Sequence, residues 1–237
     1  MDRQYLEAGA TPDFFYFKAK NRLIEVLLSK VKQETRPKIL DVGVGSGEEL
    51  SVIKKFGEIY VAEPDLDLLR RIPEDLVVEK NNCELGAIQY PDHFFDWVLA
   101  FDVLEHIEDD RSAVLQILRV LKPGGFFVFT VPAFGFLFGA HDLALQHFRR
   151  YNKKMIRNLL VDFKSRELGC WVFFFFLPLA LQRRLKRHSL NYQVHFMALP
   201  KAINRIFYSI LIFESWLINK RIPLPVGTTL YGIYQKK

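Results

Sequence analysis

The glycine-rich loop after the first predicted strand is the feature of this chain whose spacing points most clearly to chemistry. A short apolar run contains Asp41 near its end, and Gly43, Gly45 and Gly47 follow at alternate positions. Glycines in such a turn let a ligand approach the backbone, and the free N–H groups of the following helix favour a carboxylate. A dinucleotide fingerprint would place its third glycine one position later. The loop therefore favours a compact cofactor that carries an adenosine and a charged amino acid.

A second acidic residue lies at the end of the next predicted strand. Residues 59–62 are apolar, and Glu63 follows them, 22 positions after Asp41. A carboxylate at this place can accept hydrogen bonds from both hydroxyls of a ribose. A solvated loop carboxylate is the alternative, and the upstream glycines argue against it.

Two further groups of side chains follow the fourth and fifth predicted strands, where an acceptor could bind. His106 belongs to the first group and His147 to the second, and either imidazole is a candidate catalytic base. The second group also offers cations that suit a phosphate or carboxylate of a substrate. Its candidate substrate-binding residues are His141, Arg149, Arg150 and Tyr151. The alternative is the solvated basic start of a helix with a surface histidine.

Strands alternate with helices between residues 36 and 133, which predicts a parallel sheet with its site at the carboxyl ends of the strands. The expected strands cover residues 38–42, 59–62, 77–79, 95–100 and 126–131, and the expected helices begin near residues 48, 67 and 111. In the C-terminal part we expect a sixth strand within residues 168–179, a helix over 203–218 and a seventh strand over 226–234.

The composition limits the class of protein. Half of the 237 residues are hydrophobic, enough for one domain with an elaboration, and the net charge of +6 keeps anionic partners open. Cys83 and Cys170 match no metal-ligand spacing, so we expect reduced thiols in an intracellular protein and no metal site. The N-terminal segment has no apolar signal-peptide core. The uncharged run over residues 168–182 is about 15 residues long, whereas a membrane-spanning helix needs roughly 20.

Four motifs in order give the chain a resemblance to a known family. They are ILDVGVGSGE over residues 39–48, the acid Glu63, FDWVLAFDVLEHIED over 95–109, and RVLKPGGFFVFTVPA over 119–133. Together they resemble the class I S-adenosylmethionine-dependent methyltransferases. The HFRRY segment over 147–151 resembles an element of a subgroup found among glycan and lipid-linked sugar pathways.

The resemblance implies a doubly wound α/β fold with a mostly parallel, seven-stranded Rossmann-like sheet and helices on both faces. It implies S-adenosyl-L-methionine as the cofactor and S-adenosyl-L-homocysteine as the product. The three glycines of the loop would line the methionine moiety, Asp41 would hold its amino group, and Glu63 would bind the ribose. The other expected cofactor-binding residues are Pro64, Asn82, Cys83 and Phe101. Asn82 departs from the acidic residue often found there, although an amide can still bond the adenine amino group.

Three regions are expected along the chain. Residues 1–35 would form an N-terminal helical cover, and residues 36–140 the cofactor-binding core. Residues 141–237 would add an apolar and basic helical elaboration on the acceptor side, together with the last strands of the sheet. The aromatic stretches beside basic clusters in this part fit contact with a membrane surface or a lid over a hydrophobic acceptor. A core extension or a homodimer interface would explain them equally well.

We expect an enzyme that moves a methyl group to a small or lipid-linked acceptor, with a saccharide and a phosphate-bearing molecule as candidates. Holding the reactants together would supply most of the acceleration. The expected location is cytoplasmic, with peripheral contact at the inner face of the membrane, as a monomer or homodimer. The alternatives are an RNA methyltransferase and a non-catalytic adaptor that binds a membrane or partner. Nucleic acid is disfavoured because the aromatics form contiguous blocks instead of following a basic stripe. A nicotinamide-dependent dehydrogenase is disfavoured by the glycine spacing.

Overall fold

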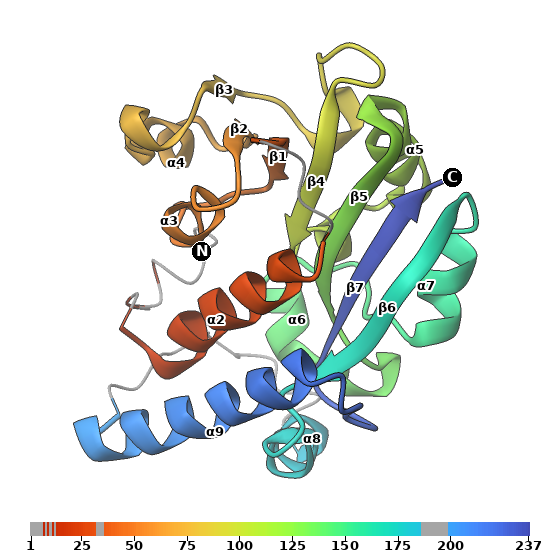
Figure 1. The fold of residues 1–237 in the computed structure, drawn as a ribbon. Helices are drawn as coiled ribbons and strands as arrows, with labels where there is room; N and C mark the ends of the chain where they lie inside the picture. Colours follow the sequence, from red (N-terminus) through yellow and green to blue (C-terminus); the bar gives the residue numbers. More distant parts are fainter. Residues whose placement is uncertain (1–6, 8, 10, 12, 32–35, 186–198) are drawn as a thin grey trace.

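A seven-stranded sheet forms the centre of the computed structural model, which describes residues 7, 9, 11, 13–31, 36–185 and 199–237 (Figure 1). The strand order is β3-β2-β1-β4-β5-β7-β6. The strands are β1 (Lys38–Val42), β2 (Glu58–Ala62), β3 (Glu79–Asn81), β4 (Phe95–Phe101), β5 (Leu121–Pro132), β6 (Phe163–Trp171) and β7 (Thr229–Lys236). β1 to β5 pair in parallel, whereas β7 runs antiparallel to both β5 and β6. The predicted fold class is confirmed.

The helices form two groups around this sheet (Figure 1). In one, α2 (Phe15–Ser29) contacts α3 (Leu50–Ile53) and packs along α9 (Lys201–Asn219). In the other, α5 (Asp110–Val120) contacts α7 (Lys153–Leu159). The remaining helices are α4 (Leu66–Arg71), α6 (Ala140–Ala144) and α8 (Phe176–Leu185). Among the described residues, no helix combines the length and apolarity needed to cross a membrane.

Burial explains why the central strands read as continuous apolar runs. All but one residue of β4 is buried, as are four of the five residues of β1, because helices cover both faces of a parallel sheet. The carboxyl ends of β1 and β4 are neighbours, with Val42 opposite Ala100. The two motifs that follow these strands are therefore brought to one edge of the sheet.

Several predicted elements differ from the structure in extent, and the fifth strand, expected over residues 126–131, covers Leu121–Pro132. The helix expected to begin near residue 48 is α-helical only over Leu50–Ile53. The third strand lies two residues later than predicted, because this edge strand pairs with β2 only through Glu79–Asn81. The seventh strand begins at Thr229 instead of residue 226.

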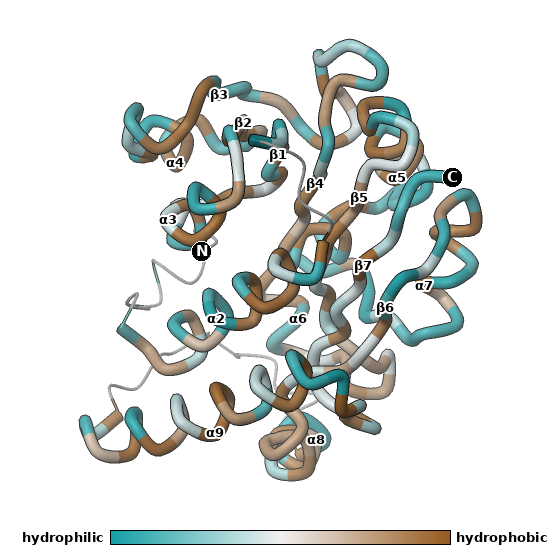
Figure 2. The backbone as a smooth tube through the Cα atoms, viewed as in Figure 1, coloured by the Kyte–Doolittle hydropathy of each residue, from teal (hydrophilic) through white to brown (hydrophobic). Residues whose placement is uncertain are grey.

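The apolar segment 168–179 contains only the last part of a strand. β6 ends at Trp171, Val172 takes a positive φ of 63°, and α8 begins at Phe176. Pro178 lies in the first turn of α8, where a missing N–H costs little. The chain therefore changes from strand to helix inside an unbroken apolar run, and the run gives no sign of this boundary. Figure 2 shows hydrophobic residues along α8 and α9.

Candidate active site

Two pockets meet at the carboxyl ends of β1 and β4. The larger one, which we call the glycine-loop groove, has a volume of about 1010 Å³ and passes Gly45, Glu63 and Cys83. The second, which we call the aromatic chamber, has a volume of about 370 Å³. Gly43 and Asp102 line both pockets. A ligand in the groove and a ligand in the chamber would therefore both contact these two residues.

The glycine loop depends on backbone conformations that other residues rarely adopt. Gly43 has a φ of +62°, and a Cβ added there would lie 2.7 Å from Cγ2 of Val103. Gly45 has a φ of +56°, and its N–H donates to Oε2 of Glu63 at 2.8 Å. The other carboxylate oxygen of Glu63 accepts from the Asp65 N–H at 2.9 Å. Glu63 therefore ties the glycine loop to the end of β2 and faces the groove.

Asp41 lies fully buried on β1, two residues before the loop. Neither of its carboxylate oxygens accepts a hydrogen bond from the described residues. Burial raises the pKa of Asp41 well above its ordinary value, and the nearby Glu49 raises it further. A ligand ammonium brought near would offset that cost. This buried carboxyl group fits the expected binding of an amino group. Asp41 lines neither pocket. The carboxylate and a ligand ammonium would therefore attract each other without direct contact.

Some of the remaining predicted cofactor-binding residues line a pocket, and the others hold the loops that form the groove. Pro64 and Cys83 line the groove, while Phe101 lines the chamber. Asn82 lines neither pocket, since its amide donates to the carbonyls of Glu63 and Pro64 at 2.9 Å each. Gly47 also lies outside both linings, and its N–H donates to the Val44 carbonyl at 3.0 Å. These last two residues shape the loops that carry the groove.

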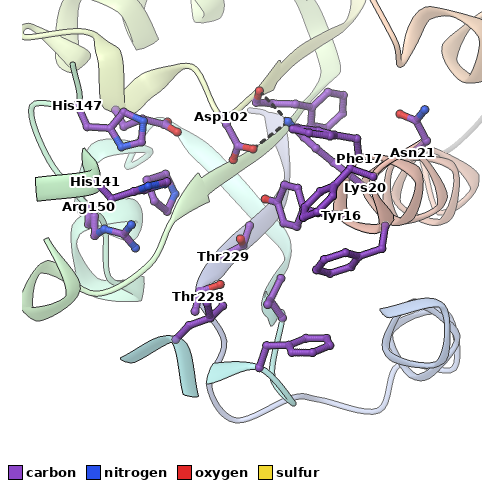
Figure 3. A pocket seen from close by; sticks show the side chains of 18 of the residues that line it. Tyr16, Phe17, Lys20, Asn21, Asp102, His141, His147, Arg150, Thr228 and Thr229 are labelled. Carbon is purple, nitrogen blue, oxygen red and sulfur yellow. Dashed lines mark hydrogen bonds and ion pairs between the residues drawn. The ribbon is translucent and has the colours of Figure 1, made fainter. Parts of the chain in front are cut away.

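Lys20 is a site residue that the sequence did not single out. Its Nζ lies 2.8 Å from Oδ2 of Asp102 and 3.3 Å from the Phe101 carbonyl, which joins α2 to the end of β4 (Figure 3). Burial alone would lower the pKa of Lys20, but Asp102, Tyr16 and Glu49 together raise it by more, so the ammonium stays protonated. Asp102 has a φ of +61°, and its other oxygen accepts from the Thr130 hydroxyl at 2.9 Å. The only sequence signal was the basic run after the N-terminal aromatics.

A buried ion cluster forms the opposite wall of the chamber. Asp142 is fully buried, and Nε of Arg150 and Nδ1 of His147 lie 2.7 and 3.2 Å from its Oδ1. Arg183, on α8, contacts the other oxygen at 3.1 Å. Burial would raise the pKa of Asp142, yet the hydrogen bond from His147 and the charge of Arg150 hold it below its ordinary value. Asp142 therefore remains an anion and fixes three side chains from two segments.

The two chamber histidines are neutral near neutral pH. Burial lowers the pKa of His141 to about 3, and the charge of Arg183 contributes to the same shift. Burial also lowers the pKa of His147, although its hydrogen bond to Asp142 opposes this. Each imidazole therefore keeps one nitrogen lone pair. Figure 3 shows both rings and Arg150 across the chamber from Tyr16, Phe17 and Lys20.

The chain brings the two groups of candidate histidines together. The Phe148 N–H donates to the Glu105 carbonyl at 2.8 Å, which places His147 beside His106. Their ring centroids are 4.6 Å apart with the planes nearly perpendicular. His106 lines the groove and His147 the chamber. The pair thus lies where the two pockets adjoin.

Arg149 and Tyr151 have different positions from the other predicted substrate residues. His141 and Arg150 line the chamber, but Arg149 and Tyr151 appear in neither lining. NH1 of Arg149 lies 2.8 Å from Asp110, and the Tyr151 hydroxyl donates to the same carboxylate at 2.8 Å. Both side chains therefore fasten the segment after β5 to the start of α5.

Aromatic side chains from distant segments close the chamber. They come from the start of α2, from the turn before α8 and from α9, and include Phe15, Phe175 and Phe207. The rings of Phe15 and Phe175 each lie within 5.3 Å of the Phe207 ring, centroid to centroid. Residues 1–35 were expected to form a helical cover, and a lid over a hydrophobic acceptor was one of the interpretations of the aromatic C-terminal part, to which α9 belongs.

Comparison with known proteins agrees with this geometry. Residues 40–129 match the family model described as a methyltransferase domain. An uncharacterized methyltransferase of Schizosaccharomyces pombe is 37% identical over 115 residues, which are 42% of this chain and 41% of that protein. Phosphoethanolamine N-methyltransferase 1 of Zea mays is 32% identical over 106 residues, 41% of this chain and 21% of that protein.

The fold is also found among solved structures. Phosphoethanolamine N-methyltransferase 2 of Haemonchus contortus, in complex with phosphomonomethylethanolamine and S-adenosylhomocysteine, superposes with a TM-score of 0.59. The superposition covers 92% of this chain and 52% of that one, at 19% sequence identity. Residues 40–129 thus match a methyltransferase domain, and the chain shares its fold with solved methyltransferase structures that hold S-adenosylmethionine or S-adenosylhomocysteine. The chain spans less than half the length of the curated relatives it matches.

Proposed function

We propose that the protein transfers the methyl group of S-adenosylmethionine to a small or lipid-linked acceptor bound in the aromatic chamber. The observation that carries this proposal is the junction of the two pockets at Gly43 and Asp102. With the cofactor in the groove, its sulfonium would lie near this junction, and an acceptor in the chamber would approach the methyl group from the other side. Positioning of this kind can supply about 7–11 kcal/mol of a transfer barrier.

Two guanidinium groups on one wall of the chamber support a phosphate-bearing acceptor, while Glu48, Glu49, Asp102 and Glu105 line other parts of the chamber. Arg150 and Arg183 bring two positive charges to the wall, and Asp142 offsets one of them. A guanidinium pair with one net positive charge suits a phosphate better than a neutral sugar. The maize relative is named for a phosphate-bearing amine, which agrees with this chemistry. A glycan-related acceptor, as the subgroup resemblance suggests, would need its own phosphate or lipid phosphate.

The arrangement of α8 supports an acceptor with a long apolar part. Phe175, Leu179 and Arg183 recur every four residues and face the chamber. Leu177, Leu181 and Leu185 each lie two residues after one of these, on the opposite side of the helix, and they are exposed. One short helix therefore separates the chamber from an apolar outer surface.

Methyl transfer with a labelled cofactor tests the proposed function. We expect label from S-adenosylmethionine to enter lipid or low-molecular-mass material when the protein acts on a total lipid and small-molecule extract. Transfer of label to bulk tRNA in place of that fraction would contradict the proposal and favour the RNA alternative, which should also weaken steeply with salt. Gly43→Val is the matched inactive control, because its side chain would meet Val103 at the junction.

We further propose that the outer face of α8 and α9 contacts an anionic membrane surface. Leu177 and Leu181 on α8, and Phe213 and Trp216 on α9, are exposed apolar residues. Exposed cations flank them, among them Arg184, Arg205 and Lys220. Large apolar side chains beside cations are typical of surfaces that dip into the headgroup region of anionic bilayers.

Vesicle flotation tests the membrane contact. We expect the protein to float with vesicles of phosphatidylcholine and phosphatidylglycerol, and Leu177→Glu with Leu181→Glu to abolish this. Leu115→Glu is the control, since Leu115 is also exposed but lies on α5. Equal flotation of the double variant and wild type would overturn the proposal. Flotation by a protein that binds no S-adenosylhomocysteine would instead favour the non-catalytic adaptor.

A further inference from the structure

We propose that Glu105, His106 and His147 form a binding site for a divalent transition-metal ion. One carboxylate oxygen of Glu105 and one ring nitrogen of each histidine all lie within 4.8 Å of one another. Two ligand atoms bound to one ion at about 2.1 Å can be up to about 4.2 Å apart, so small side-chain rotations would complete the site. Two imidazoles with one carboxylate suit zinc, manganese, iron or cobalt better than magnesium or calcium.

The fold holds these three residues together although 41 positions separate the two histidines. Glu105 and His106 belong to a single turn of 3-10 helix, Leu104–His106, directly after β4. The hydrogen bond from the Phe148 N–H to the Glu105 carbonyl fixes His147 against this turn. The Glu105 side chain is buried, with 1% of the residue exposed. Sequence spacing could not reveal the site, because its ligands come from two segments joined only in the folded chain.

A carboxylate supports His147 from behind, as is usual for metal-binding histidines. Nδ1 of His147 faces Oδ1 of Asp142 at 3.2 Å, which leaves Nε2 for a ligand. Such a partner fixes the tautomer and the ring orientation and raises the basicity of the nitrogen that binds the metal. Asp142 is itself held by Arg150 and Arg183 at 2.7 and 3.1 Å. The support is therefore rigid and stays ionised.

The position of the cluster suggests what a bound ion would do. Glu105 and His147 line the aromatic chamber, while His106 lines the glycine-loop groove. An ion between them would lie at the junction of the two pockets and could coordinate an oxygen of the acceptor beside the cofactor methyl group. This role rests on the proposed function. It replaces the role of His147 as a proton acceptor, because a metal-bound Nε2 has no lone pair left.

Metal binding to untagged, chelator-stripped protein tests the inference. We titrate with Co²⁺, following its ligand-field absorption, and with Zn²⁺ by calorimetry. We expect one ion per chain, and an affinity at least about tenfold lower in each of Glu105→Gln, His106→Asn and His147→Asn. His93→Asn is the matched control, because His93 is an exposed histidine away from the cluster and should bind the ion as wild type does.

S-adenosylhomocysteine binding to the same samples separates the possible failures. Retained binding in the three variants would show that they are folded, so that their loss of metal reports on the site. Wild type that binds S-adenosylhomocysteine but no metal, or variants that bind the ion like wild type, would overturn the metal site and leave the proposed function standing. Wild type that binds metal but no S-adenosylhomocysteine would overturn the proposed function instead.

Discussion

Glu63→Ala is expected to lower the affinity for S-adenosylhomocysteine by about 100-fold. Glu63 would accept hydrogen bonds from the ribose hydroxyls, and a hydrogen bond to a charged group contributes about 1.5–3 kcal/mol. Two such bonds correspond to at least about 3 kcal/mol, or about two factors of ten in affinity. Glu63 also accepts from the Gly45 N–H, so its loss would loosen the loop that faces the methionine moiety. Isothermal titration calorimetry measures the effect directly.

Glu58→Ala is the matched control for this experiment. Glu58 begins β2, the same strand whose other end precedes Glu63, and it lines neither pocket. We expect its affinity for S-adenosylhomocysteine to equal that of wild type. If the Glu63 and Glu58 variants bound alike, the assignment of the groove to the adenosine part of the cofactor would be wrong.

Arg150→Ala is expected to destabilise the fold by about 3–5 kcal/mol. Arg150 is 4% exposed, and its guanidinium lies 2.7 Å from the fully buried Asp142. Removing one partner of a buried pair leaves the other charge without adequate compensation, which accounts for a cost of this size. Arg183 and His147 still contact Asp142, so the lower end of the range is expected. Urea unfolding followed by circular dichroism gives the free energy of unfolding.

The neighbouring arginine provides the comparison. The Arg149 side chain is 26% exposed and pairs with the partly exposed Asp110, and such pairs contribute about 0–1 kcal/mol. Arg149→Ala should therefore cost at most about 1 kcal/mol. Similar losses in the two variants would mean that the Asp142 cluster does not hold the segment after β5 in place.

Several residues that line the glycine-loop groove were predictable because their signals are local. A strand, a glycine turn and an acidic residue at the next strand end follow one another within the chain, and parallel pairing brings strand ends to one edge. The predicted positions of Gly43, Gly45 and Glu63 on the groove follow from this rule. Asn82 shows the limit of this rule, because strand-end position does not predict side-chain orientation. Its amide donates to the backbone carbonyls of Glu63 and Pro64.

The acceptor side was harder to predict because its residues come from distant segments. No sequence pattern around Asp142 indicates that Arg150 and Arg183 both form ion pairs with it. These ion pairs form only because the fold buries Asp142 between the two segments. The HFRRY segment was expected to supply two arginines and a tyrosine to the substrate. In the fold, alternate sides of an extended segment point apart, so that Arg150 faces the chamber while Arg149 reaches Asp110.

The α8 region shows why the apolar run 168–179 was misleading. Hydrophobic periodicity distinguishes a strand from a helix only when polar residues interrupt it, and no charged residue stands between Glu167 and Arg183. The positive φ of Val172 marks the end of the strand, but no glycine, asparagine or other turn residue at this position indicates it in the sequence.

Calorimetric titration of the wild-type protein with S-adenosylhomocysteine tests the central claim most directly. If the glycine-loop groove holds the cofactor of a methyltransferase, one molecule should bind per chain, with a dissociation constant on the order of micromolar, near −8 kcal/mol. S-adenosylmethionine should compete for the same site. A correctly folded wild-type protein that binds neither compound would contradict the account.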